Sequence, residues 1–167
     1  FTSVPLIDRL DDLGIEKVDY REISSETELR SLLAELRAKG IVYDEIVLAG
    51  HGTKDTIALG GSDRRIKADE KLDDDLYIDF GDFDDPTLRM SDVLTSRGSL
   101  ILLSCSNGSG AEKEDNMANR YAGTLYRGQR VVSSQVPTNI LYLDRGADGG
   151  TEWYWDGNMP YIAEGKI

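Results

Sequence analysis

Two short apolar runs stand out in the hydrophobic pattern, and each leads to a chemically reactive residue. The first covers residues 46–50 and is followed by His51, and the second covers residues 100–103 and reaches Cys105. The second run is too short for a helix and has glycines on both sides, which favours a strand covered on both faces. The pattern therefore predicts two buried strands with His51 and Cys105 at their carboxyl ends.

A helix is predicted before the first of these strands. Ser25 and Glu28 have the spacing of a capping box, leucines follow at helical spacing, and Gly40 ends the pattern. Residues 16–23 alternate between apolar and polar side chains like a strand. This strand, the helix and the His51 strand are therefore predicted to form a right-handed βαβ unit.

A second helix is predicted in the crossover to the Cys105 strand. It would begin at Pro86, run to about Ser96 and stop at Gly98, which gives a second βαβ unit. The rest of the pattern predicts a short excursion at 56–59, a solvated loop at 60–75, a strand at 76–80, a helix at 116–126, a strand at 131–134 and a hairpin of 139–143 with 151–155. We expect an α/β fold with a mostly parallel central sheet and a C-terminal β-hairpin, as one domain over residues 1–167.

Composition and charge exclude several classes of function. The chain has 167 residues, 40% of them hydrophobic, which suits a single domain with a sizeable core. Its net charge of −12 argues against nucleic acid and anionic membrane as partners, because phosphate neutralisation needs clustered Lys and Arg. One cysteine allows neither an internal disulfide nor a zinc site built from Cys and His.

The location of the protein is only partly constrained by its sequence. We find no run long enough to cross a bilayer and no signal-peptide pattern, so a soluble protein is expected. The chain begins with Phe1, which suggests a processed product or a domain of a longer protein. Localisation and oligomeric state therefore stay open.

Cysteine and histidine each occur once in the chain, and together they suggest a catalytic pair. An imidazole can take the thiol proton and produce a thiolate nucleophile near neutral pH. The carboxyl ends of parallel strands border one crevice in open α/β sheets, so His51 and Cys105 are predicted to meet there. Taken singly, a lone cysteine is more often a core residue and a lone histidine a loop residue. Gly52 after the histidine and the glycine-rich turn after the cysteine favour the catalytic interpretation.

Other kinds of site have weaker signals. The glycine-rich turn at residues 106–110 lacks the lysine and the spacing of a phosphate loop, and no Gly-x-Ser-x-Gly motif surrounds Ser104 or Ser106. Calcium is conceivable, but the acidic spacing does not match an EF-hand and a solvated acidic loop is the preferred interpretation. The carboxylates concerned are Asp79, Asp82, Asp84 and Asp85. No metal or cofactor is otherwise predicted.

The motif order resembles a known family. A strand with His-Gly, followed about fifty residues on by a strand with Cys, is similar to the caspase-like cysteine peptidases of clan CD. Residues 57–59, 88–94 and 100–105 resemble the segment order of the bacterial CHAT branch, whereas residues 131–134 and the Trp-bearing hairpin are closer to the autoprocessing cysteine peptidase domains of bacterial toxins. The resemblance covers roughly residue 43 to the C-terminus. The chain lacks Gln-Ala-Cys before the nucleophile, so caspase specificity for aspartate is not expected.

The resemblance implies a fold, an activity and a set of site residues. The fold would be a caspase-like three-layer αβα sandwich, and the activity that of a cysteine endopeptidase, with autoprocessing as one mode. Cys105 would be the nucleophile and His51 the acid, with the N–H groups of Gly52 and Cys105 as the oxyanion hole. A glycine at position 52 would leave room for the substrate carbonyl oxygen. The substrate would lie beside the strand whose last residues line its pocket, namely Ser133, Ser134 and Gln135.

Several points stay open at this stage. No third catalytic residue can be named; Asp19 is conceivable, and Asp44 is at the wrong end of its strand. Relatives differ in preferring Arg, Lys or Leu before the scissile bond, and the acidic charge disfavours an inositol-phosphate activator. A protein or peptide substrate is expected. The alternative is a non-catalytic module that uses the same fold for protein interaction.

Overall fold

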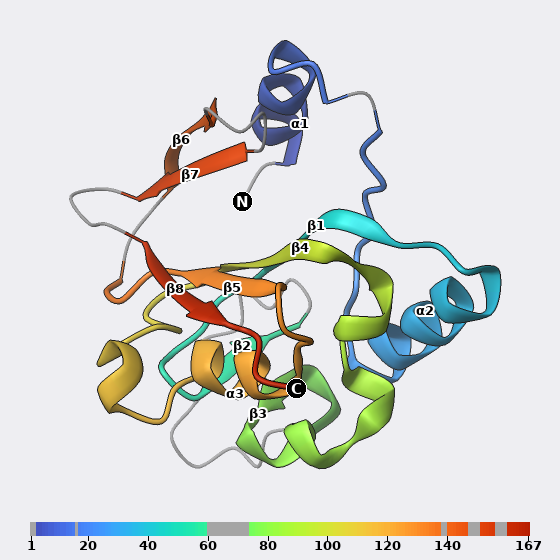
Figure 1. Cartoon of the computed structure of the whole chain (residues 1–167), viewed down its shortest axis with the longest axis vertical. Coiled ribbons are helices and arrows are strands. Elements are labelled where there is room, and N and C mark those ends of the chain that lie inside the picture. Colours follow the sequence, from blue (N-terminus) through green and yellow to red (C-terminus); the bar gives the residue numbers. More distant parts are fainter. Residues whose placement is uncertain (1–2, 16, 60–73, 138–139, 147–150, 156–159) are drawn as a thin grey trace.

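A four-stranded sheet forms the centre of the molecule (Figure 1). The computed structural model describes residues 3–15, 17–59, 74–137, 140–146, 151–155 and 160–167. The strand order is β1 (Tyr43–Ala49), β4 (Leu94–Leu103), β5 (Arg130–Ser133) and β8 (Tyr161–Glu164). The first three are parallel and β8 is antiparallel to β5. The predicted mixed α/β fold with a mostly parallel central sheet is confirmed.

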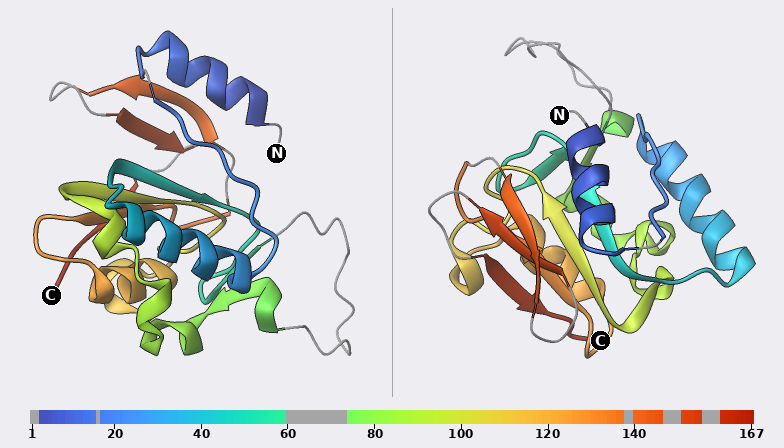
Figure 2. Two further views of the ribbon diagram at one scale, coloured as in Figure 1. Left: turned by 90° about the vertical axis from the view of Figure 1, so that its right-hand side faces the viewer. Right: turned by 90° about the horizontal axis from the view of Figure 1, so that it is seen from above.

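Both faces of the sheet are covered (Figure 2). On one face lie α2 (Glu26–Lys39) and α3 (Met117–Thr124). On the other lie α1 (Ser3–Asp12) and the antiparallel hairpin of β6 (Ile140–Arg145) and β7 (Thr151–Trp155). The predicted C-terminal hairpin is therefore present, and the layer that it forms contains one helix beside it.

The predicted helix between residues 25 and 40 is confirmed as α2. The Glu28 N–H donates to Ser25 Oγ at 3.2 Å, and the Glu28 carboxylate accepts from the Ser24 N–H at 2.7 Å. Gly40 takes the left-handed conformation with φ 63°, which favours glycine at the end of a helix. Local sequence signals thus define both ends of this element.

The predicted strand at residues 16–23, and with it the first βαβ unit, is wrong. Residues 17–24 form an extended connection without strand pairing between α1 and α2. Val18 and Tyr20, which supply the alternation, are 44% and 53% exposed. The apolar side chains of this alternating pattern therefore face solvent and do not pack on a sheet.

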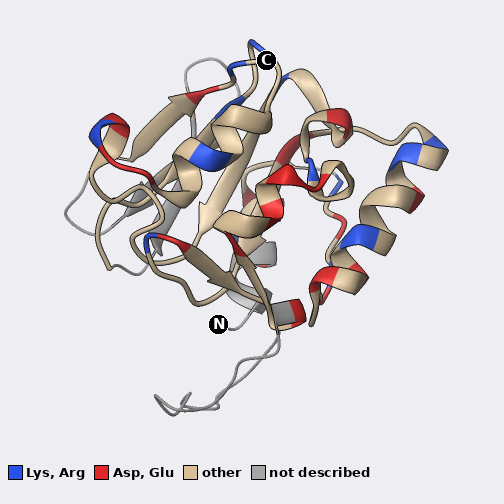
Figure 3. Cartoon of the chain, turned by 90° about the horizontal axis from the view of Figure 1, so that it is seen from below, with Lys and Arg blue, Asp and Glu red and all other residues tan. Residues whose placement is uncertain are grey.

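The crossover from β1 to β4 also differs from its prediction. It contains the antiparallel pair β2 (Thr56–Ala58) and β3 (Tyr77–Asp79), and most of the predicted loop at 60–75 lies outside the described residues. The predicted helix from Pro86 is replaced by short 3₁₀ helices that lie beside α2 (Figure 3). The two in that segment are η3 (Pro86–Leu88) and η4 (Ser91–Val93). Two more precede Pro86, namely η1 (Asp74–Leu76) and η2 (Phe80–Asp84).

Arg37 of α2 binds this segment through its backbone carbonyls. Its guanidinium donates to the carbonyl oxygens of Thr87 at 2.9 Å and of Arg89 at 2.5 Å. The backbone bonds within the segment are of the 3₁₀ type, since the Leu88 and Arg89 N–H groups donate to the carbonyl oxygens of Asp85 and Pro86, three residues earlier. β4 then begins at Leu94, so Gly98 lies inside the strand and does not stop a helix.

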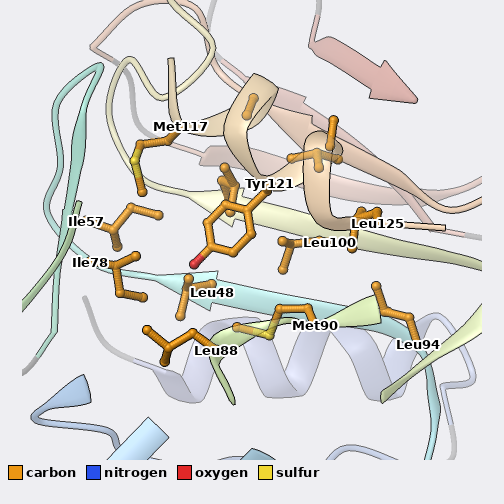
Figure 4. Close-up of a cluster of buried hydrophobic side chains, with 14 of the residues drawn as sticks. Leu48, Ile57, Ile78, Leu88, Met90, Leu94, Leu100, Met117, Tyr121 and Leu125 are labelled. Carbon is orange, nitrogen blue, oxygen red and sulfur yellow. The ribbon is translucent and has the colours of Figure 1, made fainter. Parts of the chain in front are cut away.

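The core is divided by the sheet into two clusters. The larger one joins leucines of α2 to β1, β4 and α3, with Leu48, Leu100, Tyr121 and Leu125 among its members (Figure 4). The smaller one packs Trp153 of β7 against Ile101, Leu103 and Val132. β4 therefore contributes alternate side chains to both clusters, which is the double burial that its continuous apolar run predicts.

No helix among the described residues has the length and apolar character needed to cross a membrane.

Candidate active site

The structure brings the ends of the two predicted strands together. β1 and β4 are neighbours in the sheet, and their parallel pairing runs in register from Glu45 with Ser99 to Ala49 with Leu103. The Gly50 N–H continues this pairing by donating to the Leu103 carbonyl oxygen at 3.2 Å. The loops that carry His51 and Cys105 therefore follow neighbouring strands, at the same end of the sheet. Below, this edge of the sheet means the carboxyl ends of its parallel strands. The His51 side chain is exposed and Cys105 is half-buried.

The loop after β1 is a tight turn back into β2. The Ala58 N–H donates to the His51 carbonyl oxygen at 2.7 Å, and the Thr53 N–H donates to the Thr56 carbonyl oxygen at 3.1 Å. These two bonds flank the bridge between Gly52 and Ile57, so that bridge is a non-hydrogen-bonded pair. In such a pair the N–H and C=O point away from the partner strand. The Gly52 N–H is thus directed away from β2, as a donor to a bound carbonyl oxygen must be.

Position 52 has no room for a side chain. A Cβ there would overlap Ser104 Oγ and would lie 2.7 Å from the Thr56 carbonyl oxygen. From the sequence, a glycine was expected at position 52 to leave space for a substrate carbonyl oxygen. The structure gives a different reason, because Ser104 and Thr56 already occupy the space that a side chain would need.

Gly52→Ala is therefore expected to destabilise the protein by about 1–3 kcal/mol, as overpacking of a fixed site does. Urea denaturation gives this value. Gly123→Ala is the control, because a Cβ at that exposed helix position meets nothing within 4 Å. Equal stability of Gly52→Ala and the parent protein would show that this loop moves freely.

The loop after β4 has a fixed and strained conformation. Ser106, directly after Cys105, has φ 60°, which is uncommon for a residue other than glycine and costs about 1 kcal/mol or more. The turn is held on both sides, because the Gly108 N–H donates to the Ser134 carbonyl oxygen at 2.8 Å and the Asn107 carbonyl oxygen accepts from the Ala118 N–H at 3.0 Å. Cys105 is therefore presented by a turn that is anchored to β5 and α3.

The residues predicted to line the substrate pocket follow β5 at the same edge. The side chains of Ser133 and Ser134 are 0% and 1% exposed, and Ser134 Oγ donates to the Val136 carbonyl oxygen at 2.8 Å. Gln135 is half-buried. β5 is paired on both sides, by β4 and β8, up to Ser133. A substrate strand beside β5 is therefore restricted to the backbone of Ser134 and Gln135.

The suggestion of Asp19 as a third catalytic residue is wrong. Its carboxylate accepts from the Tyr43 hydroxyl at 2.9 Å and pairs with Arg21. Tyr43 is the first residue of β1, which is about 20 Å long at about 3.3 Å per residue, so Asp19 lies near the opposite end of the strand from His51. Asp44, which accepts from Thr95 Oγ1, lies at that same wrong end, as predicted.

The acidic residues considered for calcium have other contacts. Asp79 accepts from the Gly81 N–H and Asp82 from the Asp79 N–H, so the two form a capping box. Asp85 accepts from Thr87 and contacts Arg30, and Asp84 is exposed. Within the part of the chain that the structure describes, no three His, Cys, Asp or Glu side chains are grouped to hold a metal ion.

Three buried polar atoms at this edge have no hydrogen-bond partner among the described residues. They are Ser104 Oγ, Asn107 Oδ1 and Ser133 Oγ, which come from the end of β4, its following loop and the end of β5. Most buried polar atoms of native proteins have partners, so exceptions call for a functional or structural explanation. Sequence reasoning did not single out Asn107, and the one available signal was a polar residue inside the glycine-rich turn.

Comparison of the chain with protein-family models, with curated proteins and with solved structures finds no match. The resemblance to clan CD peptidases therefore stays a prediction that rests on the order of the motifs in the sequence.

Proposed function

We propose that the chain is a cysteine endopeptidase of the caspase-like type. The observation that carries this proposal is the pairing of β1 with β4, which brings the only histidine and the only cysteine to the same edge of the sheet. Ligands of open α/β sheets bind beyond the carboxyl ends of the strands, so the pair lies where a substrate would bind. A parallel sheet covered on both faces is consistent with the caspase-like sandwich.

In the proposed reaction, Cys105 Sγ attacks the carbonyl carbon of the scissile peptide bond. His51 accepts the thiol proton and later gives it to the leaving amine as the C–N bond breaks, which leaves a thioester on Cys105. Water then attacks the thioester, releasing the carboxylic acid and restoring the thiol. The Gly52 N–H, which points away from β2, would stabilise the oxyanion together with the Cys105 N–H.

The substrate is proposed to be a peptide with Arg, Lys or Leu before the scissile bond. The net charge of −12 raises the local concentration of cationic peptides and opposes acidic ones. Asp79 and Asp82, which might otherwise attract a basic side chain, are engaged in the capping box. The preference for Arg over Leu therefore rests on the overall charge alone. Cleavage could act on another protein or within a longer chain that contains this one.

A positional peptide library tests the proposal. We expect cleavage after Arg, Lys or Leu and none after Asp, with Cys105→Ala as the inactive control. Preference for Asp would show a caspase-type pocket, contrary to the proposed specificity. Failure to cut any member while Cys105 also resists a thiol-reactive peptide would contradict the peptidase proposal itself.

The second candidate is a non-catalytic module for protein interaction, and one observation favours it. Two hollows of the molecule lie elsewhere, one between α3 and the 3₁₀ helices near Phe83, the other along β8 near Tyr161. Neither is lined by His51 or Cys105. Ser133 and Ser134 are also buried, so neither hydroxyl is exposed to a substrate.

A further inference from the structure

We infer that Asn107 is a positioning residue that holds the loop carrying His51 against the loop carrying Cys105. The inference rests on the proposed function, because positioning has a chemical consequence only if His51 acts on Cys105. Asn107 is two residues beyond Cys105, inside the anchored turn, and its side chain is 0% exposed.

The Asn107 amide links the two loops directly. Its Nδ2 donates to the Thr53 carbonyl oxygen at 2.5 Å and to the Thr56 carbonyl oxygen at 3.2 Å. Thr53 lies in the turn that carries His51, and Thr56 is the first residue of β2. A carboxamide has two N–H donors, so one side chain satisfies both carbonyls. Of the two possible orientations of the Asn107 amide, only the one with Nδ2 toward these carbonyls is chemically acceptable, because Oδ1 in that place would face two other acceptors.

The link joins two loops that are each anchored to α3 by a backbone hydrogen bond. The backbone of Asn107 is fixed by Ala118 of α3, and the next residue is fixed by Ser134 after β5. The turn that carries His51 has a second anchor, the Met117 N–H, which donates to the Lys54 carbonyl oxygen at 2.9 Å. Since catalysis by a nucleophile and its acid depends on their separation to within about 1 Å, the amide sets a quantity on which the rate depends.

The side-chain amide of Asn107 differs in its hydrogen bonds from the other buried amides, those of Gln129 and Asn116. Gln129 donates to the Ser91 carbonyl oxygen and accepts from the Tyr126 N–H, and Asn116 likewise both donates and accepts. Asn107 instead keeps a buried Oδ1 without a partner among the described residues. A buried acceptor without a partner destabilises the folded state, so this amide is not arranged for stability alone.

The test measures the rate at which iodoacetamide alkylates Cys105 in the native full chain at pH 7. Asn107→Leu keeps the shape of the side chain but has no donor, and Gln129→Leu is the matched control. Gln129 also binds the Thr95 carbonyl oxygen at 3.1 Å, but at the opposite edge of the sheet. We expect Asn107→Leu to slow alkylation at least about tenfold, to the rate of His51→Ala, while Gln129→Leu stays within about twofold of the parent protein.

The double variant of Asn107→Leu and His51→Ala gives a second readout. If Asn107 acts through His51, the double variant reacts no more slowly than His51→Ala alone. Additive effects would overturn the inference, as would an unchanged rate in Asn107→Leu while His51→Ala is slow, and the proposed function would survive both. Parent-like alkylation in His51→Ala would overturn the proposed function together with this inference. Should Asn107→Leu not fold, Asn107→Asp replaces it, because its ionised carboxylate faces the same two carbonyl oxygens and must also slow the reaction.

Discussion

Replacing Cys105 with alanine is expected to reduce peptide cleavage to the background level, by at least about 1000-fold. The thiol supplies the bond to the substrate carbonyl, and the chain has no other cysteine to replace it. Fold and stability should change little, since a half-buried side chain loses one sulfur atom. Initial rates with a cleaved library peptide give the first value, and urea denaturation gives the second.

His51→Ala is expected to cause a loss of similar size, because the leaving amine then has no acid to protonate it. Thr95→Ala is a suitable control, since Thr95 lies at the opposite end of β4 and contacts only Asp44 with its hydroxyl in the bonds described. Cleavage by either dyad variant at more than about a tenth of the parent rate would exclude the proposed mechanism.

Glu26→Gln is expected to stabilise the protein at pH 8 by up to about 3 kcal/mol and to have little effect at pH 4.5. Glu26 is 4% exposed, and burial together with the neighbouring Asp82 carboxylate raises its pKa to about 7, although Arg30 contacts it at 2.6 Å. The acidic residues concerned lie near the start of α2 and the adjacent 3₁₀ helices (Figure 3). Three carboxylates, those of Glu26, Asp82 and Asp85, share the one guanidinium of Arg30.

The direction of this effect follows from proton binding. Between pH 4.5 and about 7 the folded protein keeps the Glu26 proton that the unfolded chain has released, so stability falls as pH rises through this window. Glutamine stays neutral, so Glu26→Gln does not lose this stability as pH rises. Urea denaturation of both proteins at pH 4.5, 6 and 8 measures the free energy of unfolding and shows the difference.

Glu28→Gln is the control for Glu26→Gln. Glu28 lies in the same helical turn, but its bonds from Ser24 lower its pKa, so its ionised form stabilises the folded state. Its replacement should therefore weaken the protein at pH 8. A loss of stability at pH 8 in Glu26→Gln would show that the Arg30 ion pair outweighs the burial of charge.

Sequence patterns predicted those elements whose signals are local. The caps of α2 and the continuous apolar run of β4 are encoded within a few residues, and both elements form, although β4 begins at Leu94, inside the segment predicted as a helix. The segment from Pro86 was mispredicted as one helix, and its main contact, with Arg37 about fifty residues earlier, has no local signal in the sequence. β8 was not predicted, because four residues with little alternation gain strand structure only by pairing with β5.

The candidate site shows the same division. His51 and Cys105 could be proposed as neighbours because both follow strands, and parallel strands end at one edge. The contact of Asn107 with the Thr53 and Thr56 carbonyls could not be inferred, since it depends on how two loops pack beyond the sheet. Exclusion of Asp19 likewise required knowing that Tyr43 holds it at the far end of β1.

The most direct test of the central claim is covalent labelling of Cys105 by a peptidyl chloromethyl ketone with Leu or Arg beside the reactive group. Intact mass and peptide mapping of the native full chain should show one adduct, at Cys105, that forms at least about tenfold faster than in His51→Ala or in urea-unfolded protein. Labelling of the native protein that is no faster than that of the unfolded chain, or that is unaffected by His51→Ala, would contradict the proposed dyad.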